Sequence, residues 1–359
     1  MQAKSNTQPW IGNRLVESIF ILSPPFVALL VVTLFPAVFK NSDQMPVAYW
    51  VILIVMIDVA HVYSTLFRTY FNPSAFRQQH PLFIAIPIFC YIGGVLLYLY
   101  SGGLFWRALA YLAVFHFIRQ QYGFMRIYSR KENQGRIAGC IDTIAIYTST
   151  IYPLLYWHFA GIHKNFNWFV DGDFMLGRSE LILTISYWVY LFVIAAYAVK
   201  ETGLSFKNRS FNVPKNLLVA GTFLSWYFGI VYYNGDMAFT TLNVVSHGIP
   251  YMALVWLNER KRYQTSGEKK TTLLRLTFNT YGGVILFTGL LILFAYIEEG
   301  LWDGLIWKEH GNFFRVFSLL PAVSTNLLLA MLVPLLALPQ STHYVLDGFI
   351  WKLRKKALN

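Results

Sequence analysis

The sequence predicts an all-α fold: a polytopic integral membrane helix bundle with about ten transmembrane helices. Three observations lead to this fold class. Of the 359 residues, 56% are hydrophobic and only 13% are charged, whereas soluble domains carry about 25% charged residues. Long apolar segments recur along the whole chain, and the connections between them alternate in charge. Aromatic residues make up 18% of the chain, which excludes an intrinsically disordered protein.

The apolar segments are long enough to cross a bilayer, which takes about 20 mostly apolar residues. Such segments lie near residues 15–39, 47–71, 81–101, 103–127, 139–163, 180–199, 215–233, 237–257, 274–298 and 316–351. The first contains Pro24, Pro25 and Pro36, and the last contains Pro334 and Pro339. Because proline removes a helical hydrogen bond, we expect a break in each of these two segments.

The charged connections predict the orientation in the membrane. Basic residues gather near 72–80, 128–138, 200–214 and 258–273, and in the C-terminal tail. The opposite connections are neutral or acidic, with Asp171 and Asp173 in one and Glu298, Glu299 and Asp303 in another. This alternation follows the positive-inside rule and places both termini in the cytoplasm.

The predicted organisation is a cytoplasmic N-terminal tail at 1–14, a single transmembrane helical domain at 15–351 and a basic cytoplasmic tail at 352–359. The first apolar stretch has no small-residue cleavage site, so we expect a retained helix and not a signal peptide. The net charge of +12 is explained by loops that face anionic lipid, and no nucleic acid partner is predicted. The expected location is a bacterial inner (cell) membrane, crossed many times.

Four histidines fall inside predicted spans, where an ionisable residue is a functional candidate by default. His61, His116, His247 and His343 belong to four helices that all run towards the cytoplasm. They lie about eight to eleven residues from the cytoplasmic ends, a depth of about 12–17 Å at about 1.5 Å per residue. We therefore expect four imidazoles at one level of the bundle.

Two carboxylates accompany these histidines. Asp58 precedes His61 by three positions and Asp347 follows His343 by four, so each pair shares a helical face. Each aspartate is expected either to bind the same metal or to fix the imidazole tautomer. Imidazole with carboxylate suits Fe(II) first, with manganese or zinc as alternatives, and the lack of thiolate argues against a soft site.

A polar run follows His116 near the cytoplasmic end of its span. Three and four positions after His116, Arg119 and Gln120 share its face, and Gln121 and Tyr122 follow. These side chains are expected to orient ligands, bind a polar substrate group or steady an oxygen intermediate. On the span of His247, Asn243 is a similar candidate.

Each of these residues also has a structural interpretation. A single intramembrane histidine can simply bond a neighbouring helix, Asp58 could pair with Arg68 or Arg119, and Arg119 and Gln121 could extend to the interface. Asp142 is a further buried candidate without an assigned role. The remaining histidines fall near the surfaces and are set aside; they are His80, His158, His163 and His310.

The motifs of several enzyme classes are missing. The sequence has no GxSxG elbow, P-loop, HExxH or dinucleotide-binding glycine pattern. It also lacks the HxxxH and HxxHH boxes expected of membrane desaturases and alkane hydroxylases.

Two short motifs resemble the membrane-embedded β-carotene dioxygenases of the Brp/Blh group. They are the Phe115-His116-Phe117 step and the late His343-x-x-x-Asp347 spacing, in a polytopic chain with scattered intramembrane histidines. The early Pro-His-Gly-x-x-Asp box of that family is missing, and Asp58-x-x-His61 reverses its order. The resemblance covers these motifs only, and it implies a membrane-embedded iron oxygenase.

The sequence as a whole predicts a metal-dependent oxygenase or oxidase with non-haem iron. Its substrate would be lipid-soluble, such as an isoprenoid, a carotenoid or an acyl chain, and its partners would be O₂, membrane lipid and an electron donor. The predicted metal ligands are Asp58, His61, His116, His247, His343 and Asp347. The other predicted site residues are Arg119, Gln120, Gln121, Tyr122 and Asn243.

Two other classes stay open at this stage. A proton-coupled transporter could use the buried His, Asp and Arg residues as a relay, and would contain inverted repeats and broken helices. A membrane acyltransferase would need one histidine as general base, for which His247 near Asn243 is the candidate. A purely structural role would leave the buried polar residues unexplained.

Overall fold

The computed structural model describes residues 8–40, 45–132, 134–161, 168–265 and 271–351. The predicted all-α fold class is confirmed, because these residues form helices and connections and no β-strand. A single isolated bridge joins Ala160 and Arg178. Two sequence features lie outside the described residues, namely His163 and the basic tail at 352–359.

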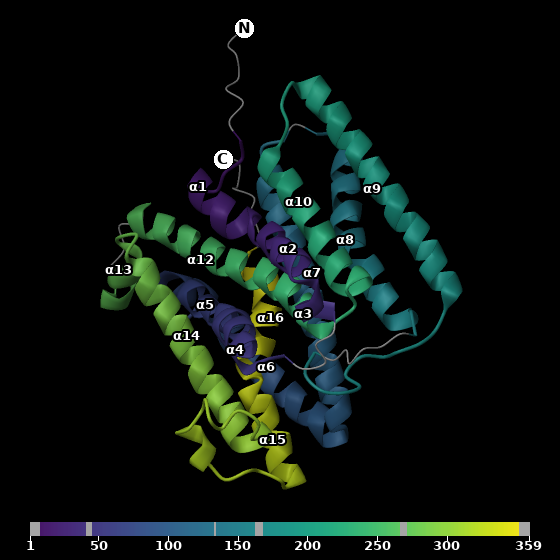
Figure 1. Ribbon diagram of the computed structural model, residues 1–359. Helices are drawn as coiled ribbons and strands as arrows, with labels where there is room; N and C mark the ends of the chain where they lie inside the picture. Colours follow the sequence, from purple (N-terminus) through teal and green to yellow (C-terminus); the bar gives the residue numbers. More distant parts are fainter. Residues whose placement is uncertain (1–7, 41–44, 133, 162–167, 266–270, 352–359) are drawn as a thin grey trace. The chain divides into compact units, whose positions relative to one another are not determined.

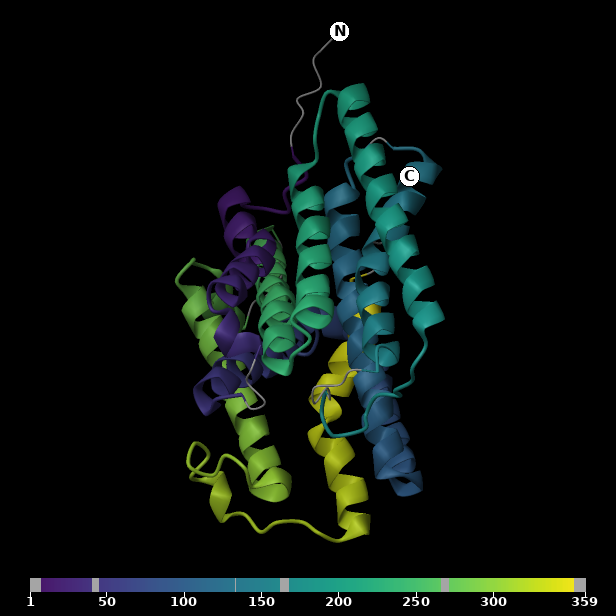
Figure 2. The same ribbon diagram turned by 45° about the vertical axis from the view of Figure 1, so that its right-hand side comes forward.

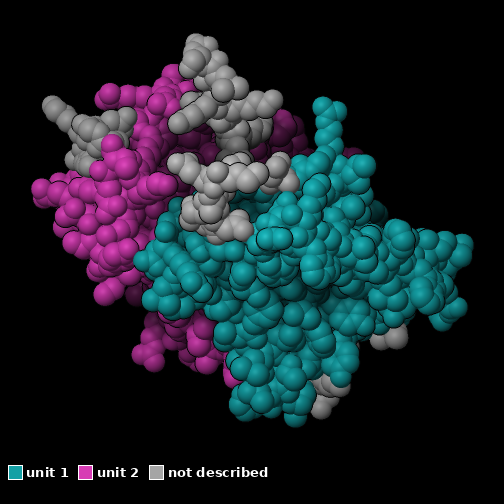
Figure 3. All heavy atoms as spheres, turned by 90° about the horizontal axis from the view of Figure 1, so that it is seen from above, with its two compact units in different colours: residues 1–45, 117–167, 174–254 teal, residues 46–116, 168–173, 255–359 magenta. Residues whose placement is uncertain are grey.

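The chain forms two compact units, coloured separately in Figure 3. Unit 1 contains residues 1–45, 117–167 and 174–254, and unit 2 contains residues 46–116, 168–173 and 255–359. Helix α7 (Gly102–Ser129) contributes its residues up to His116 to unit 2 and the rest to unit 1. Helix α12 (Val245–Thr265) contributes its residues up to Leu254 to unit 1 and the rest to unit 2.

The elements belonging wholly to unit 1 are α1 (Arg14–Glu17), η1 (Ser18–Leu22), α2 (Pro24–Leu34), α3 (Pro36–Lys40), α8 (Arg136–Phe159), α9 (Glu180–Asn208), α10 (Val213–Trp226), η3 (Tyr227–Tyr232), α11 (Asp236–Phe239) and η4 (Thr240–Val244). Helix α8 packs against α9 and α10, and α10 packs against α2 (Figure 1).

The elements of unit 2 are α4 (Val47–Trp50), η2 (Val51–Val59), α5 (Ala60–Arg68), α6 (Pro73–Tyr100), α13 (Thr272–Phe278), α14 (Gly283–Trp302), η5 (Asp303–Trp307), η6 (Phe317–Leu319), α15 (Asn326–Leu336) and α16 (Leu338–Ile350). Helix α5 packs against α14 and α16, and α6 packs against α15 and α16. Figures 1 and 2 show α15 and α16 as one bent rod beside α6.

The helices agree with the apolar segments, with differences at their ends. Continuous helix runs through α14 and η5 to Trp307, so Glu298 and Asp303 lie within helical segments and not in the predicted loop. Both are buried. The predicted last span begins too early, because residues before Asn326 form only the short turn η6.

Among the residues that the structure describes, four helical segments are long and apolar enough to cross a membrane, and up to six if each of two bent pairs counts as one span. The four are Val47–Arg68, Pro73–Tyr100, Glu180–Asn208 and Gly283–Trp307. The bent pairs are Arg14–Leu22 with Pro24–Leu34, at 45°, and Asn326–Leu336 with Leu338–Ile350, at 44°. The breaks predicted from the prolines of the first and last segments are therefore present.

A buried ion-pair cluster crosslinks three helices of unit 1 and accounts for Asp142. The side chain of Lys215 is fully buried, and its Nζ donates to Glu201 Oε1 at 2.6 Å and to Glu132 Oε2 at 2.9 Å. Lys200 bridges Asp142 and Glu201. Three carboxylates thus share two ammonium groups away from solvent, which makes the cluster costly to disturb.

In unit 2, helix α6 packs closely against the bent rod formed by α15 and α16. A Cβ added at Gly94 would lie 2.9 Å from the Cβ of Pro334, so a larger residue would push α6 away from α15.

Arg68, the last residue of α5, links this helix to α12 and α16. Its Nη1 donates to Glu259 Oε1 at 2.7 Å, and its Nη2 donates to the carbonyl of Ile350 at 3.3 Å. These contacts fix α5 and α16, which carry three of the predicted ligands, His61, His343 and Asp347.

Candidate metal centre

Three of the four predicted histidines meet inside unit 2. His61 on α5, His116 on α7 and His343 on α16 are all buried. Each offers a ligand atom, and these three atoms lie within 4.8 Å of one another. The Nε2 atoms of His116 and His343 are 3.1 Å apart. Histidines about 55 and 227 positions apart in sequence therefore share one buried site, as their common depth predicts.

An oxygen atom lies near the other ring nitrogen of each histidine. Thr65 Oγ1 is 2.6 Å from His343 Nδ1. Asp347 Oδ2 is 3.5 Å from His116 Nδ1, and Asp58 Oδ1 is 3.8 Å from His61 Nδ1. Outer partners of this kind fix the tautomer and ring orientation of metal-binding histidines.

Helical spacing explains why Asp58 and Thr65 both lie near the histidines. Asp58, His61 and Thr65 are spaced by three and four residues, so they lie on one face of the η2–α5 rod. The π-helical segment η2 ends at Val59, two residues before His61. Such π-helical turns widen a helix locally and often occur at functional sites.

Asp347 has a different partner from the one that its sequence position indicates. It follows His343 by four positions on α16, yet its carboxylate lies near His116 of α7. His343 instead contacts Thr65 of α5. Thr65 and Asp347 thus each lie beside a ring from another helix, His343 of α16 and His116 of α7.

The distance between two of the rings fits a shared metal ion. Nitrogens that bind one ion at about 2.0–2.2 Å, at angles of about 90–109°, lie about 2.8–3.6 Å from each other. The 3.1 Å between His116 Nε2 and His343 Nε2 falls in this range. A direct hydrogen bond between two neutral rings gives a similar distance, and metal analysis distinguishes the two arrangements.

His247, the fourth predicted ligand, belongs to unit 1. Its buried ring stacks on Phe117, with centroids 3.6 Å apart and planes 5° from parallel. The group with ligand atoms within 4.8 Å consists of the other three histidines. A role for His247 as a ligand stays a prediction.

Gln120 and Gln121 bind the backbone of α12. Gln120 Nε2 donates to the carbonyl of His247 at 2.9 Å, and Gln121 Nε2 approaches the carbonyl of Ser246 at 3.4 Å. Pro250 has no N–H for the Ser246 carbonyl four residues before it. The glutamine therefore replaces a helical hydrogen bond that the proline removes, and both amides hold α12 in place beside α7.

The other polar candidates also have local partners. Arg119 is exposed, and its Nη1 donates to the hydroxyl of Tyr147 at 2.7 Å. Its guanidinium carbon lies 5.1 Å from the ring centroid of Tyr122. Asn243 is buried in η4, and its Nδ2 donates to the carbonyl of Phe239 at 3.2 Å. These contacts favour the structural interpretation of Arg119 and Asn243.

Sequence reasoning missed three residues near the site. Thr65 follows His61 by one helical turn, a spacing that could have identified it. The ring of Tyr344 lies 5.1 Å from that of His116. Glu298 accepts a hydrogen bond from Tyr63 at 2.6 Å and another from Gln340. Glu298 was not considered as a site residue because the sequence places it in a predicted loop.

The excluded histidines have other contacts. His310 stacks on Trp50, with centroids 4.1 Å apart, and His158 Nδ1 lies 2.7 Å from the carbonyl of Leu154. The alternative pairing of Asp58 with Arg68 is not observed, since Arg68 pairs with Glu259.

Comparison of the chain with protein-family models, with curated proteins and with solved structures found no match. The described residues form an all-α chain with four to six candidate membrane spans and a buried group of three histidines. Functional inference therefore depends on the geometry of these side chains.

Proposed function

We propose that this chain is a membrane-embedded, metal-dependent oxygenase or oxidase that acts on a lipid-soluble substrate. The observation that carries the proposal is the approach of three buried imidazoles from three helices to within 4.8 Å. Buried polar side chains are costly in a membrane and are retained where they serve a function. A single metal ion would bind all three rings at once.

The donor set supports non-haem iron, with manganese or zinc as alternatives. Neutral imidazoles with nearby carboxylates suit Fe(II), and no thiolate belongs to the group. Bound iron would supply O₂ chemistry at coordination positions that the protein leaves open. His61, His116 and His343 would hold the ion.

The surrounding residues would keep the three imidazoles in the tautomer and orientation that bind the metal ion. Asp347 would hold the proton of His116 on Nδ1, so that the Nε2 lone pair would face the ion. Asp58 would act in the same way on His61, and the Thr65 hydroxyl would orient His343. Their roles are to position the rings and to hold a proton away from the metal-binding nitrogens.

The proposal includes a ten-span topology with both termini in the cytoplasm, in a bacterial inner membrane. The four to six candidate spans support a membrane location, and the basic connections support the orientation of the chain. The substrate would be an isoprenoid, a carotenoid or an acyl chain dissolved in membrane lipid. O₂ would be the co-substrate, and an electron donor would act from the cytoplasmic side.

Metal analysis of the purified protein tests the proposal. Protein prepared without oxygen, in detergent, is expected to contain about one equivalent of iron, manganese or zinc per chain, because three imidazoles can hold one ion. Mass spectrometry of the metals measures this content. Content far below one equivalent of any of these metals, even after incubation with each, would disprove the proposal.

Replacing Thr65 by valine removes the hydroxyl beside His343 while keeping the side-chain shape. We expect metal affinity to fall about 10–100-fold, the usual effect of losing an outer partner. Competition with a chelator of known affinity measures the change. The matched control is Thr150→Val, whose buried hydroxyl donates to the carbonyl of Tyr147 at 2.8 Å. Equal affinities in the two variants would contradict the role of Thr65.

A further inference from the structure

An apolar groove in unit 2 reaches the candidate metal centre. Its volume is about 430 Å³, and α5, α6, α15 and α16 contribute to its walls. Its lining includes Thr65 and His343. The volume falls within the range of about 300–1,000 Å³ that is typical of ligand sites.

The bend between α15 and α16 lies beside this groove. Leu335, Leu338 and Pro339 flank the 44° bend and line the groove, and Pro87 of α6 lies on the lining as well. The Leu335 side chain is 49% exposed. His343 follows Pro339 by one helical turn, so the groove leads from an exposed apolar edge to one of the three imidazoles.

The residues that line the groove favour an apolar ligand. Among the described residues that line the groove, none is Asp, Glu, Lys or Arg. A charged head group would lose its hydration there without gaining an ionic partner. A hydrocarbon chain, in contrast, would bury apolar surface on binding.

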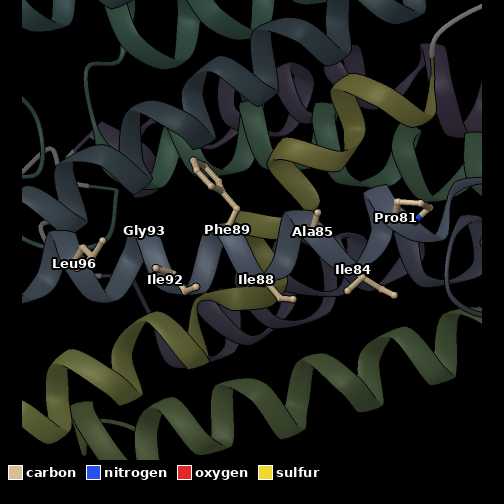
Figure 4. A pocket seen from close by; sticks show the side chains of 8 residues that line it. All are labelled: Pro81, Ile84, Ala85, Ile88, Phe89, Ile92, Gly93 and Leu96. Carbon is tan, nitrogen blue, oxygen red and sulfur yellow. The ribbon is translucent and has the colours of Figure 1, made fainter.

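A second apolar groove shows that volume alone does not identify a ligand site. It measures about 570 Å³ and is lined by one face of α6, from Pro81 to Leu96 (Figure 4). Phe89 and Leu96 on this face are 75% and 62% exposed. Its described lining contains no polar side chain, as expected for a helix surface in contact with lipid.

We propose that the groove beside His343 binds the hydrocarbon chain of the substrate, which reaches it from the lipid between α6 and the α15–α16 bend. This inference rests on the proposed function, because it makes the groove the substrate site of the same metal centre. The chain would lie along the aliphatic walls, and its reacting segment would lie near His343. Any polar end of the substrate would remain outside the groove.

Photolabelling tests this assignment. Palmitic acid with a diazirine in its chain is added to the full chain in lipid nanodiscs, and labelled peptides are mapped by mass spectrometry. We expect labelling within residues 62–70 and 335–346. Leu335→Trp places a larger side chain in the groove and should reduce this labelling about tenfold. The matched control is Leu96→Trp, an exposed leucine on the second groove, and it should have no effect.

The metal content of Leu335→Trp separates the two proposals. We expect it to equal that of the unmodified protein, because Leu335 is not a member of the histidine group. Labelling spread along the α6 face and unchanged by Leu335→Trp would overturn the groove assignment. Groove labelling that Leu335→Trp blocks, in a protein without metal, would support the groove as a binding site and refute the proposed metal chemistry.

Discussion

Replacing His343 or His116 by alanine is expected to reduce the bound metal of the purified protein to background. Loss of an outer partner already weakens metal binding about 10–100-fold, and loss of a ligand should cost more than that. The two rings approach each other at 3.1 Å, so either substitution removes one of the closest pair of donors. Metal analysis after removal of loosely bound ions measures the effect.

His158→Ala is the matched control for these variants. His158 is a partly buried histidine of α8 whose Nδ1 lies 2.7 Å from its own helix backbone, so its loss should leave the metal content unchanged. Full metal content in both His116→Ala and His343→Ala would contradict the metal centre. Loss of activity in His247→Ala alone would instead favour the acyltransferase, which needs a single essential histidine.

Replacing Lys215 by methionine is expected to destabilise the protein by about 3–5 kcal/mol, the usual cost of removing one partner from a buried ion pair. Glu201 Oε1 and Glu132 Oε2 would lose a cation that now lies 2.6 and 2.9 Å away. Lys200 would then remain beside Asp142 and Glu201, and Glu132 would lose its ammonium partner. A thermal unfolding midpoint in detergent measures the loss.

Two further variants show whether the effect comes from the buried charge. Lys207→Met removes an exposed lysine of α9 and should leave the midpoint nearly unchanged. Lys215→Met combined with Glu201→Gln removes one charge of each sign, and it should recover part of the lost stability. A midpoint for Lys215→Met equal to that of Lys207→Met would show that the cluster contributes little.

Much of the fold could be predicted from the order of apolar segments. Each of the ten predicted ranges contains helix, and the bends at Ser23 and Ala337 follow from nearby prolines. The errors are at segment ends. Glu298 was expected in a loop because acidic residues usually mark the end of a span, whereas hydrogen bonds from Tyr63 and Gln340 stabilise its carboxylate inside a helix.

The candidate site was predictable to a similar extent. Equal depth on separate helices indicated that histidines would meet, and His61, His116 and His343 do so. The position of a residue along its helix does not specify the direction in which its side chain faces around the helix axis. It therefore cannot predict which side chains contact each histidine. Gln120 and Gln121 were expected at the reacting centre, yet both contact the backbone of α12 near Pro250. Only the packing of α7 against α12 within unit 1 reveals this role.

The sequence by itself determined the helical fold class and the positions of the helices, because hydropathy is a local property of the chain. The tertiary structure decided that Asp347 lies beside His116, that Thr65 orients His343 and that a bent helix opens a groove to this ring. These features depend on how helices distant in sequence rotate and pack against one another, and no local pattern of residues specifies that rotation.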